Sequence, residues 1–185
     1  MVQAKFDPAL ALKFDLGRGT VSQSGAGARL VLSAEVVAAL LKGAPADVVR
    51  DAGQQLGTEL GRRIQPSLGE LSQAPPERVL EFLGGELALL GLGGLGMERW
   101  GRALVFALVD NPLGAAGDDF MCALFDGALL RIYGKATRAV CVKRDGERAR
   151  YLICGERAAT QVTTWLGEGL GWGDALARLD NRGEA

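Results

Sequence analysis

The feature that most constrains this chain is a row of three glycines inside a predicted helix. Pro45 is typical of a helix start, and the apolar periodicity after it predicts a helix that runs to about Ile64. Gly53, Gly57 and Gly61 recur in it at four-residue spacing and therefore lie on one face. Since each interior glycine costs ~1 kcal/mol relative to alanine, another element is expected to pack closely against this face.

That close contact could come from a helix of the same chain or from a second subunit. In a membrane this spacing marks a helix dimer, but charged side chains along the predicted helix exclude a membrane span. They are Arg50, Asp51, Glu59, Arg62 and Arg63. From the residues alone, packing within the chain is the favoured interpretation, and a subunit interface is the alternative.

Composition limits the function classes. The 185 residues are 48% hydrophobic, which is enough for a folded core, and 21 basic and 22 acidic residues give a net charge of -1. This balance argues against a nucleic-acid binder, which carries a basic surface.

Apolar runs stay shorter than the ~18 residues of a membrane span, and no signal-peptide pattern is evident. Three cysteines are typical of a reducing compartment, so we expect a cytoplasmic protein.

Several catalytic and cofactor motifs are missing or misplaced. Histidine is absent, which removes the commonest general base and zinc ligand. Gly91, Gly93 and Gly96 spell G-x-G-x-x-G, but they follow a predicted helix and precede a strand, the reverse of a dinucleotide site. Cys141 and Cys154 lie too far apart on the predicted hairpin for a disulfide and lack a metal-ligand spacing. We therefore expect no catalytic residues, no metal and no cofactor.

Local signals predict most of the remaining elements. Alternation from Leu10 to Leu16 predicts a strand, with a second short strand over residues 28–33, and Ser33 can cap a helix that runs to Lys42. The run over 118–133 is apolar on most sides and predicts a buried helix, in which Gly127 allows a close approach. Further helices are predicted from Pro75, from about residue 156 and from about residue 172, and apolar strands over 103–109.

The clearest local signal is a β-hairpin around Asp145-Gly146, a type I′ turn pair. This turn would pair Val140 with Tyr151 and place both on the apolar face that meets the core. The chain is expected to form one globular domain overall, with a strand arm over 1–32, a core over 33–155 and a helical extension over 156–185.

With these elements in order, several strings resemble the core subunits of the TRAPP vesicle-tethering complex. Those subunits share the NO-signalling/Golgi-transport ligand-binding fold with bacterial 4-vinyl reductase-type domains. The strings are "DAGQQLGTEL" (51–60), "ALVFALVDNPL" (103–113), "FMCALFDGALLRIYGKATRAVCV" (120–142) and "RDGERARYLI" (144–153). The resemblance implies an α/β fold of the α+β type, with helices packed on a twisted antiparallel sheet, and no catalysis.

The resemblance also implies dimerisation through the early helices. The resemblance therefore favours a subunit interface as the interpretation of the glycine row. That interface would be formed by Gly53, Leu56, Gly57, Leu60 and Gly61. The function expected on this basis is that of a non-enzymatic, homodimeric adaptor or scaffold, of bacterial origin given the alanine-, glycine- and arginine-rich composition. Its protein partner is unidentified, a small GTPase system being one candidate, and no nucleic acid is expected.

The alternative is a sensor domain that binds an apolar small molecule or acyl chain. The ligand would lie in a pocket between the 118–133 helix and the sheet. The expected lining residues are Phe82, Cys122, Phe125, Leu129, Val140 and Tyr151.

Overall fold

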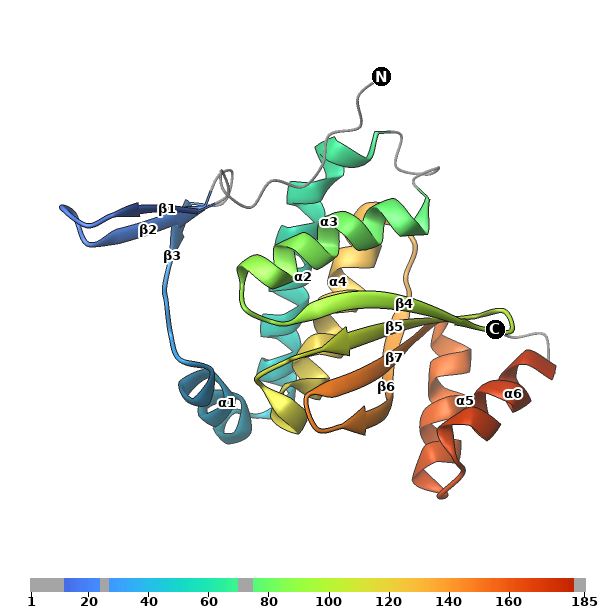
Figure 1. Cartoon of the computed structure of the whole chain (residues 1–185). Helices are drawn as coiled ribbons and strands as arrows, with labels where there is room; N and C mark the ends of the chain where they lie inside the picture. The colour runs from blue at the N-terminus through green and yellow to red at the C-terminus, as the bar shows by residue number, and fades with distance from the viewer. Residues whose placement is uncertain (1–11, 24–26, 70–74, 182–185) are drawn as a thin grey trace.

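The computed structural model describes residues 12–23, 27–69 and 75–181. In chain order the elements are β1 (Leu12–Asp15), β2 (Thr20–Gln23), β3 (Gly27–Arg29), α1 (Ala34–Gly43), α2 (Ala46–Leu68), α3 (Pro76–Leu89), β4 (Gly94–Trp100), β5 (Ala103–Val109), the 3-10 turn η3 (Gly114–Gly117), α4 (Asp118–Tyr133), β6 (Arg138–Asp145), β7 (Arg148–Cys154), α5 (Glu156–Gly167) and α6 (Trp172–Asn181). The predicted α+β class with antiparallel sheet is confirmed (Figure 1).

The main sheet has the strand order β4-β5-β7-β6 and is antiparallel throughout. Helices cover both of its faces, with α2, α3 and α4 on one side and α5 and α6 on the other (Figure 1). In β5, Phe106 and Leu108 face the first layer, whereas Ala103 and Val105 face the second. This two-sided burial explains why β5 is a continuous apolar run instead of an alternating one.

The three glycines of α2 lie against α4 of the same chain. A Cβ atom added to Gly53, Gly57 or Gly61 would lie within 2.8 Å of a backbone carbonyl oxygen of α4. The close approach is mutual, because a Cβ atom added to Gly127 of α4 would meet the carbonyl oxygen of Gln54 on α2. The two helices thus approach backbone to backbone, at a distance that only glycine permits.

This packing corrects the expected subunit interface. All three glycines are buried, Leu60 is fully buried in the core, and Leu56 packs against that core. A second subunit cannot reach the glycine face, since α4 already covers it. The glycine face thus packs on a helix of the same chain, which is the interpretation that the residues alone favour. These five residues are not an interface between copies.

The predicted hairpin forms between β6 and β7, but in a different register. The turn falls one position later than expected, and a β-bulge between Cys141 and Lys143 shifts the pairing again. As a result, Tyr151 pairs with Cys141 instead of Val140. A net shift of one residue exchanges the two faces of a strand, so Val140 points towards α5 while Tyr151 points towards α4.

The N-terminal strands form a separate small sheet, ordered β1-β2-β3. The predicted strand over 28–33 ends at Arg29, and residues 30–32, here called the strap, run in an extended path to α1 (Figure 1). Residues 10–11 of the other predicted strand lie outside the described residues. Helix α1 begins where expected, with the Ser33 side chain accepting a hydrogen bond from the Val36 N–H.

Helices long and apolar enough to cross a membrane are absent from the described part of the chain.

Candidate functional site

The candidate site lies where α4 crosses the outer strand β6. Asp118, Cys122 and Asp126 follow one another at four-residue spacing on α4, so one stripe of the helix faces β6. The Ala139 N–H donates a hydrogen bond of 2.6 Å to Asp126 Oδ1. The Cys141 backbone lies beside the Cys122 thiol and lowers its pKa, against the larger effect of burial. We call this stripe and its partners on β6 the α4 seam.

At one end of the seam, Asp118 holds a buried tyrosine and an arginine together. Arg144 Nε donates to both carboxylate oxygens of Asp118 at 2.9 Å, and the Tyr151 hydroxyl donates to Oδ1, also at 2.9 Å. Arg144 Nη2 in turn donates to the Tyr151 oxygen at 3.0 Å. Burial, followed by the nearby Asp118 charge, raises the pKa of Tyr151, so its hydroxyl stays neutral and keeps its proton for Asp118.

The ring of Tyr151 belongs to an aromatic cluster that fills the space between α4 and the sheet. Its ring centroid lies 5.3 Å from that of Phe125, and Phe125 lies 5.3 Å from Phe106, both in edge-to-face geometry. All three residues are buried. At this place the interior combines aromatic surface with a polar end, formed by Asp118 and Arg144, that binds an aromatic hydroxyl.

The thiols of the seam, and Cys154 on β7, are not activated as nucleophiles. Cys122, Cys141 and Cys154 are free. Burial is the largest cause that raises the pKa of all three, to about 12 for Cys141 and Cys154. At neutral pH they are protonated and behave as small apolar side chains.

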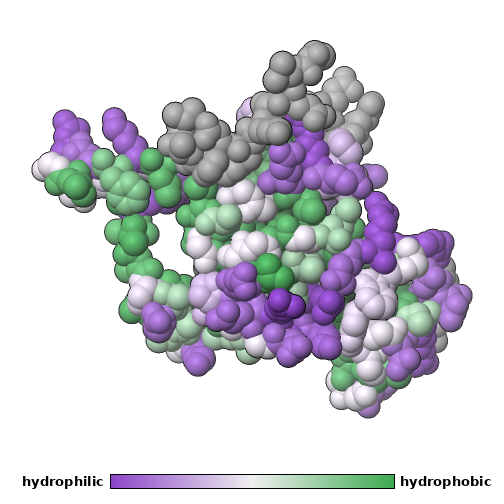
Figure 2. Space-filling view, in the orientation of Figure 1, coloured by the Kyte–Doolittle hydropathy of each residue, from purple (hydrophilic) through white to green (hydrophobic). Residues whose placement is uncertain are grey.

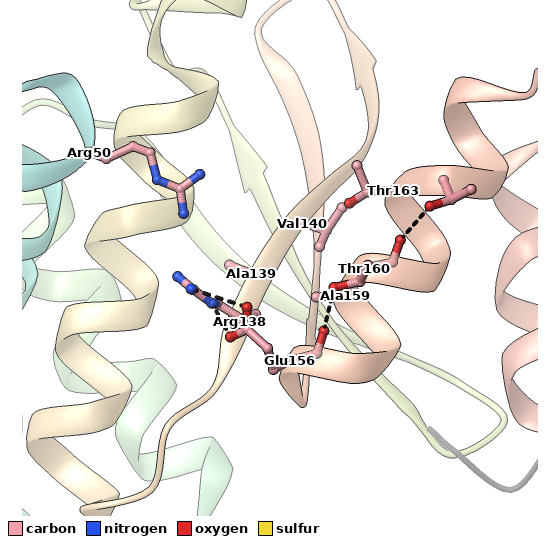
Figure 3. A pocket seen from close by; sticks show the side chains of 9 residues that line it. Arg50, Arg138, Ala139, Val140, Glu156, Ala159, Thr160 and Thr163 are labelled. Atoms are coloured by element: carbon pink, nitrogen blue, oxygen red, sulfur yellow. Dashed lines mark hydrogen bonds and ion pairs between the residues drawn. The ribbon is translucent and has the colours of Figure 1, made fainter. Parts of the chain in front are cut away.

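At the other end of the seam, Arg138 bridges two carboxylates. Its Nη1 donates to Asp126 Oδ2 at 3.2 Å and its Nε donates to Glu156 Oε2 at 2.5 Å. Burial raises the pKa of Asp126, although its hydrogen bonds from Ala139 and Arg138 oppose this. The Arg50 side chain extends from α2 towards this group but joins no ion pair within the described ranges (Figure 3).

Both ends of the seam open into surface pockets. The pocket beside Arg138 has a volume of about 310 Å³ and lies between α2, β6 and α5 (Figure 3). The pocket beside Asp118 has a volume of about 280 Å³ and lies between the α1–α2 junction and the start of α4. It is lined by Leu41, Ala44, Ala46, Val49, Ala115, Ala116, Asp118 and Asp119. This second pocket leads from the surface to the carboxylate that holds Tyr151.

Most of the residues expected to line a ligand pocket do come together. Phe82, Phe125, Leu129 and Tyr151 share one buried cluster, and Cys122 packs at its border. Val140 does not belong with them, because the register shift places it with the α5 and α6 side chains on the other face of the sheet. In the described structure, the other five expected lining residues are packed in or against this core.

Sequence reasoning missed the polar end of this region. From the sequence, Asp118 is only the first residue of the predicted 118–133 helix. Its spacing to Cys122 and Asp126 was a usable signal, since positions four and eight residues apart mark one helix face. The pairing with Arg144 had no comparable signal, because a β-bulge sets which way that side chain points.

The likeness of this chain to known proteins lies in its structure and not in its sequence. No protein-family model matches the chain, and no curated protein matches it in sequence. Among solved structures, it is similar to the crystal structure of the phenol-responsive sensory domain of the transcription activator PoxR with phenol, at a TM-score of 0.62 and 14% identity. The match covers 78% of this chain and 85% of that chain. At this identity the likeness establishes a shared fold.

This likeness corrects the expected adaptor or scaffold role. The solved domain that shares this fold is a phenol-responsive sensory domain of a transcription activator, so the adaptor or scaffold role is not retained.

Proposed function

We propose that this chain is a sensory domain that binds a small aromatic molecule bearing a hydroxyl group, in the core between α4 and the sheet. The observation that carries the proposal is the shared fold with a phenol-responsive sensory domain, over most of both chains. A second support is the polar end of the aromatic cluster, where Asp118 and Arg144 already hold a phenolic hydroxyl, that of Tyr151.

The proposed site discriminates by its one polar end. A ligand hydroxyl placed beside Asp118 forms a charge-assisted hydrogen bond, worth about 1.5–3 kcal/mol. A ring without a hydroxyl would leave Asp118 and Arg144 to satisfy each other alone. The site is therefore expected to prefer phenol to toluene, although both rings offer a similar apolar surface.

Binding requires the Tyr151 side chain to make room, because its own ring fills the position beside Asp118 and Phe125. Its edge-to-face contacts are worth about 0.5–1.5 kcal/mol each, and a ligand ring can replace them. The exchange would loosen Tyr151 from α4, and this displacement is how the domain would report that it is occupied.

The test is native mass spectrometry of the purified chain, first as isolated and then with millimolar phenol or toluene. The expected result is a phenol-bound mass and a raised Tm with phenol, and a smaller response to toluene. Absence of any bound mass, together with an unchanged Tm in phenol, contradicts the proposal.

A pair of cavity variants locates the site. Tyr151→Ala opens a ring-sized space beside Asp118 and should bind phenol more tightly than the wild type does. Trp165→Ala opens a comparable space on the opposite face of the sheet, where Trp165 is buried among α5 and α6 side chains. If the Trp165 variant gains the same preference for phenol over toluene, the proposed location is wrong.

A further inference from the structure

The surface pocket between α2, β6 and α5 lies at the opposite end of the α4 seam from Asp118. Its volume of about 310 Å³ is sufficient for a small molecule. None of the large hydrophobic side chains that are exposed in the described residues lines this pocket. Figure 2 shows such side chains elsewhere, as green surface along the small sheet and the strap. A ligand of this pocket is therefore recognised mainly through its polar groups.

Arg138 already binds a carboxylate in this pocket with two parallel hydrogen bonds. Its Nε donates to Glu156 Oε2 at 2.5 Å and its Nη2 donates to Glu156 Oε1 at 3.2 Å, while Nη1 is occupied by Asp126. The Glu156 side chain is 71% exposed. Because an ion pair with so exposed a carboxylate contributes little to stability, another carboxylate can replace Glu156 on the same two nitrogen atoms. The bond from Arg138 to Asp126 would be left intact.

Arg50 places a second positive charge at the same position. It points from α2 towards Arg138 and Glu156 (Figure 3) and joins no ion pair in the described part of the chain. The hydrogen bond from Arg138 is the main cause that lowers the pKa of Glu156, and the Arg50 charge acts in the same direction. With Glu156 turned out into solvent, the two arginines face only the carboxyl group of Asp126. At least one positive charge is then left for an anion.

The wall of the pocket on α5 offers hydrogen-bond acceptors. The Thr160 hydroxyl donates to the Glu156 carbonyl oxygen at 3.1 Å, and the Thr164 hydroxyl donates to the Thr160 carbonyl oxygen at 3.0 Å (Figure 3). Since a hydroxyl has one proton, each of these oxygens can only accept a further hydrogen bond. An ammonium group would add a third cation beside two arginines. The wall therefore favours a ligand hydroxyl.

We propose that this pocket binds a small monocarboxylate that also carries a hydroxyl group. The ligand carboxylate takes the place of Glu156 on Arg138 and pairs with Arg50, and the ligand hydroxyl donates to a threonine of α5. Val140, which the register shift moves out of the expected ligand site, provides an apolar contact beside them. The site is separate from the core between α4 and the sheet, so it stands or fails independently of phenol binding.

Isothermal titration calorimetry of the full chain with three matched compounds tests the ligand class. Propionate is lactate without the hydroxyl, and 1,2-propanediol is lactate with an alcohol in place of the carboxylate. Lactate should bind about fivefold more tightly than propionate, and 1,2-propanediol should not bind. No binding of lactate at millimolar concentrations overturns the proposal. Inorganic phosphate that binds as tightly as lactate also overturns it, because the site would then recognise charge alone.

Charge variants test the two arginine-bound positions. Arg50→Gln should weaken lactate binding at least about tenfold, because a charge-assisted hydrogen bond is lost. Arg148→Gln removes the same charge from an exposed position on β7 outside the pocket, and it should bind lactate as the wild type does. Glu156→Gln removes the competing carboxylate and should bind lactate about fivefold more tightly, a gain that misfolding cannot produce. An Arg50 variant with wild-type affinity, or a Glu156 variant without the gain, contradicts the proposed position.

A pair of nearly isosteric substitutions tests the hydroxyl contact. In the double variant Thr160→Val and Thr164→Val, the wall keeps its shape but loses its acceptors. Propionate affinity should stay unchanged, whereas the preference for lactate over propionate should disappear. A double variant that keeps the full preference shows that α5 does not bind the hydroxyl and overturns this part of the proposal.

Discussion

Two consecutive helices, α1 and α2, relate to the body of this molecule in opposite ways. Helix α2 lies so close to α4 that three of its positions admit only glycine. Helix α1, which is richer in valine and leucine, buries none of its residues. The difference teaches that the hydrophobicity of a helix does not measure how tightly it is packed. Glycine spacing is the better guide, because an unfavourable residue is retained only where another backbone must fit.

The largest effect is expected where the two backbones meet. Gly57→Ala sets a Cβ against the Leu124 carbonyl and should lower the free energy of unfolding by about 3 kcal/mol or more, because α2 and α4 must separate. Urea denaturation monitored by circular dichroism measures this. Gly43→Ala is the control, since a Cβ at the end of α1 meets no atom within 4 Å. If the two variants were equally stable, α2 would not be more tightly packed at this glycine than α1 is at Gly43.

The next effect concerns the polar end of the α4 seam. Asp118→Asn leaves Arg144 and Tyr151 without their carboxylate and should cost about 2 kcal/mol of unfolding free energy. The neighbouring Asp119→Asn, at an exposed position, should stay within about 0.5 kcal/mol of the wild type. Chemical denaturation of both variants at neutral pH provides the comparison. An Asp118 variant as stable as the Asp119 variant would mean that the seam does not depend on this charge.

A smaller effect should follow pH at Asp126. Burial raises the pKa of this carboxyl in the folded state, so the native chain binds its proton more tightly than the unfolded chain does. Its contribution to stability therefore falls as pH rises from about 4, the ordinary aspartate value, through the raised value. The difference in unfolding free energy between wild type and Asp126→Asn should shift against the wild type over that window. A shift in the opposite direction would mean that the hydrogen bonds from Arg138 and Ala139, which lower the pKa of Asp126, outweigh the effect of burial.

The smallest effect is expected in α1 itself. Leu40→Gln should change the free energy of unfolding by no more than about 0.5 kcal/mol, because Leu40 is 63% exposed. Unfolding monitored by tryptophan fluorescence measures this. A loss of 2 kcal/mol or more would show that α1 is held by its own body, and the comparison with α2 would then need revision.

The sequence predicted those elements whose signals are local. Helix α4 spans the predicted Asp118–Tyr133, and α1 starts after its Ser33 cap, because caps and glycine stops act within a few residues. The hairpin pairing could not be predicted in the same way. Its bulge depends on how β6 lies against α4, and it moved Val140 out of the expected ligand site.

The expected function failed for a related reason. The order of helices and strands is shared by proteins with unrelated roles, so it predicts a fold better than an activity. The candidate site depends on the contact of Asp118 with Arg144 and Tyr151, which are 26 and 33 residues away. Only the folded structure brings these three together, and the glycine row alone could not choose between α4 and a second subunit.

The hydrogen bonds along the α4 seam also protect the sheet. Strand β6 is the last strand on its side, and such an edge normally offers its free backbone groups to strands of other molecules. Here Asp126 accepts the N–H group of Ala139, and the Cys122 thiol lies beside the Cys141 backbone. Four residues along a helix advance about 6 Å, close to two residues along a strand, so the helix matches the repeat of the edge. Side chains of α4 thus cover part of the β6 edge at which a further strand would pair, and this arrangement opposes edge-to-edge association there.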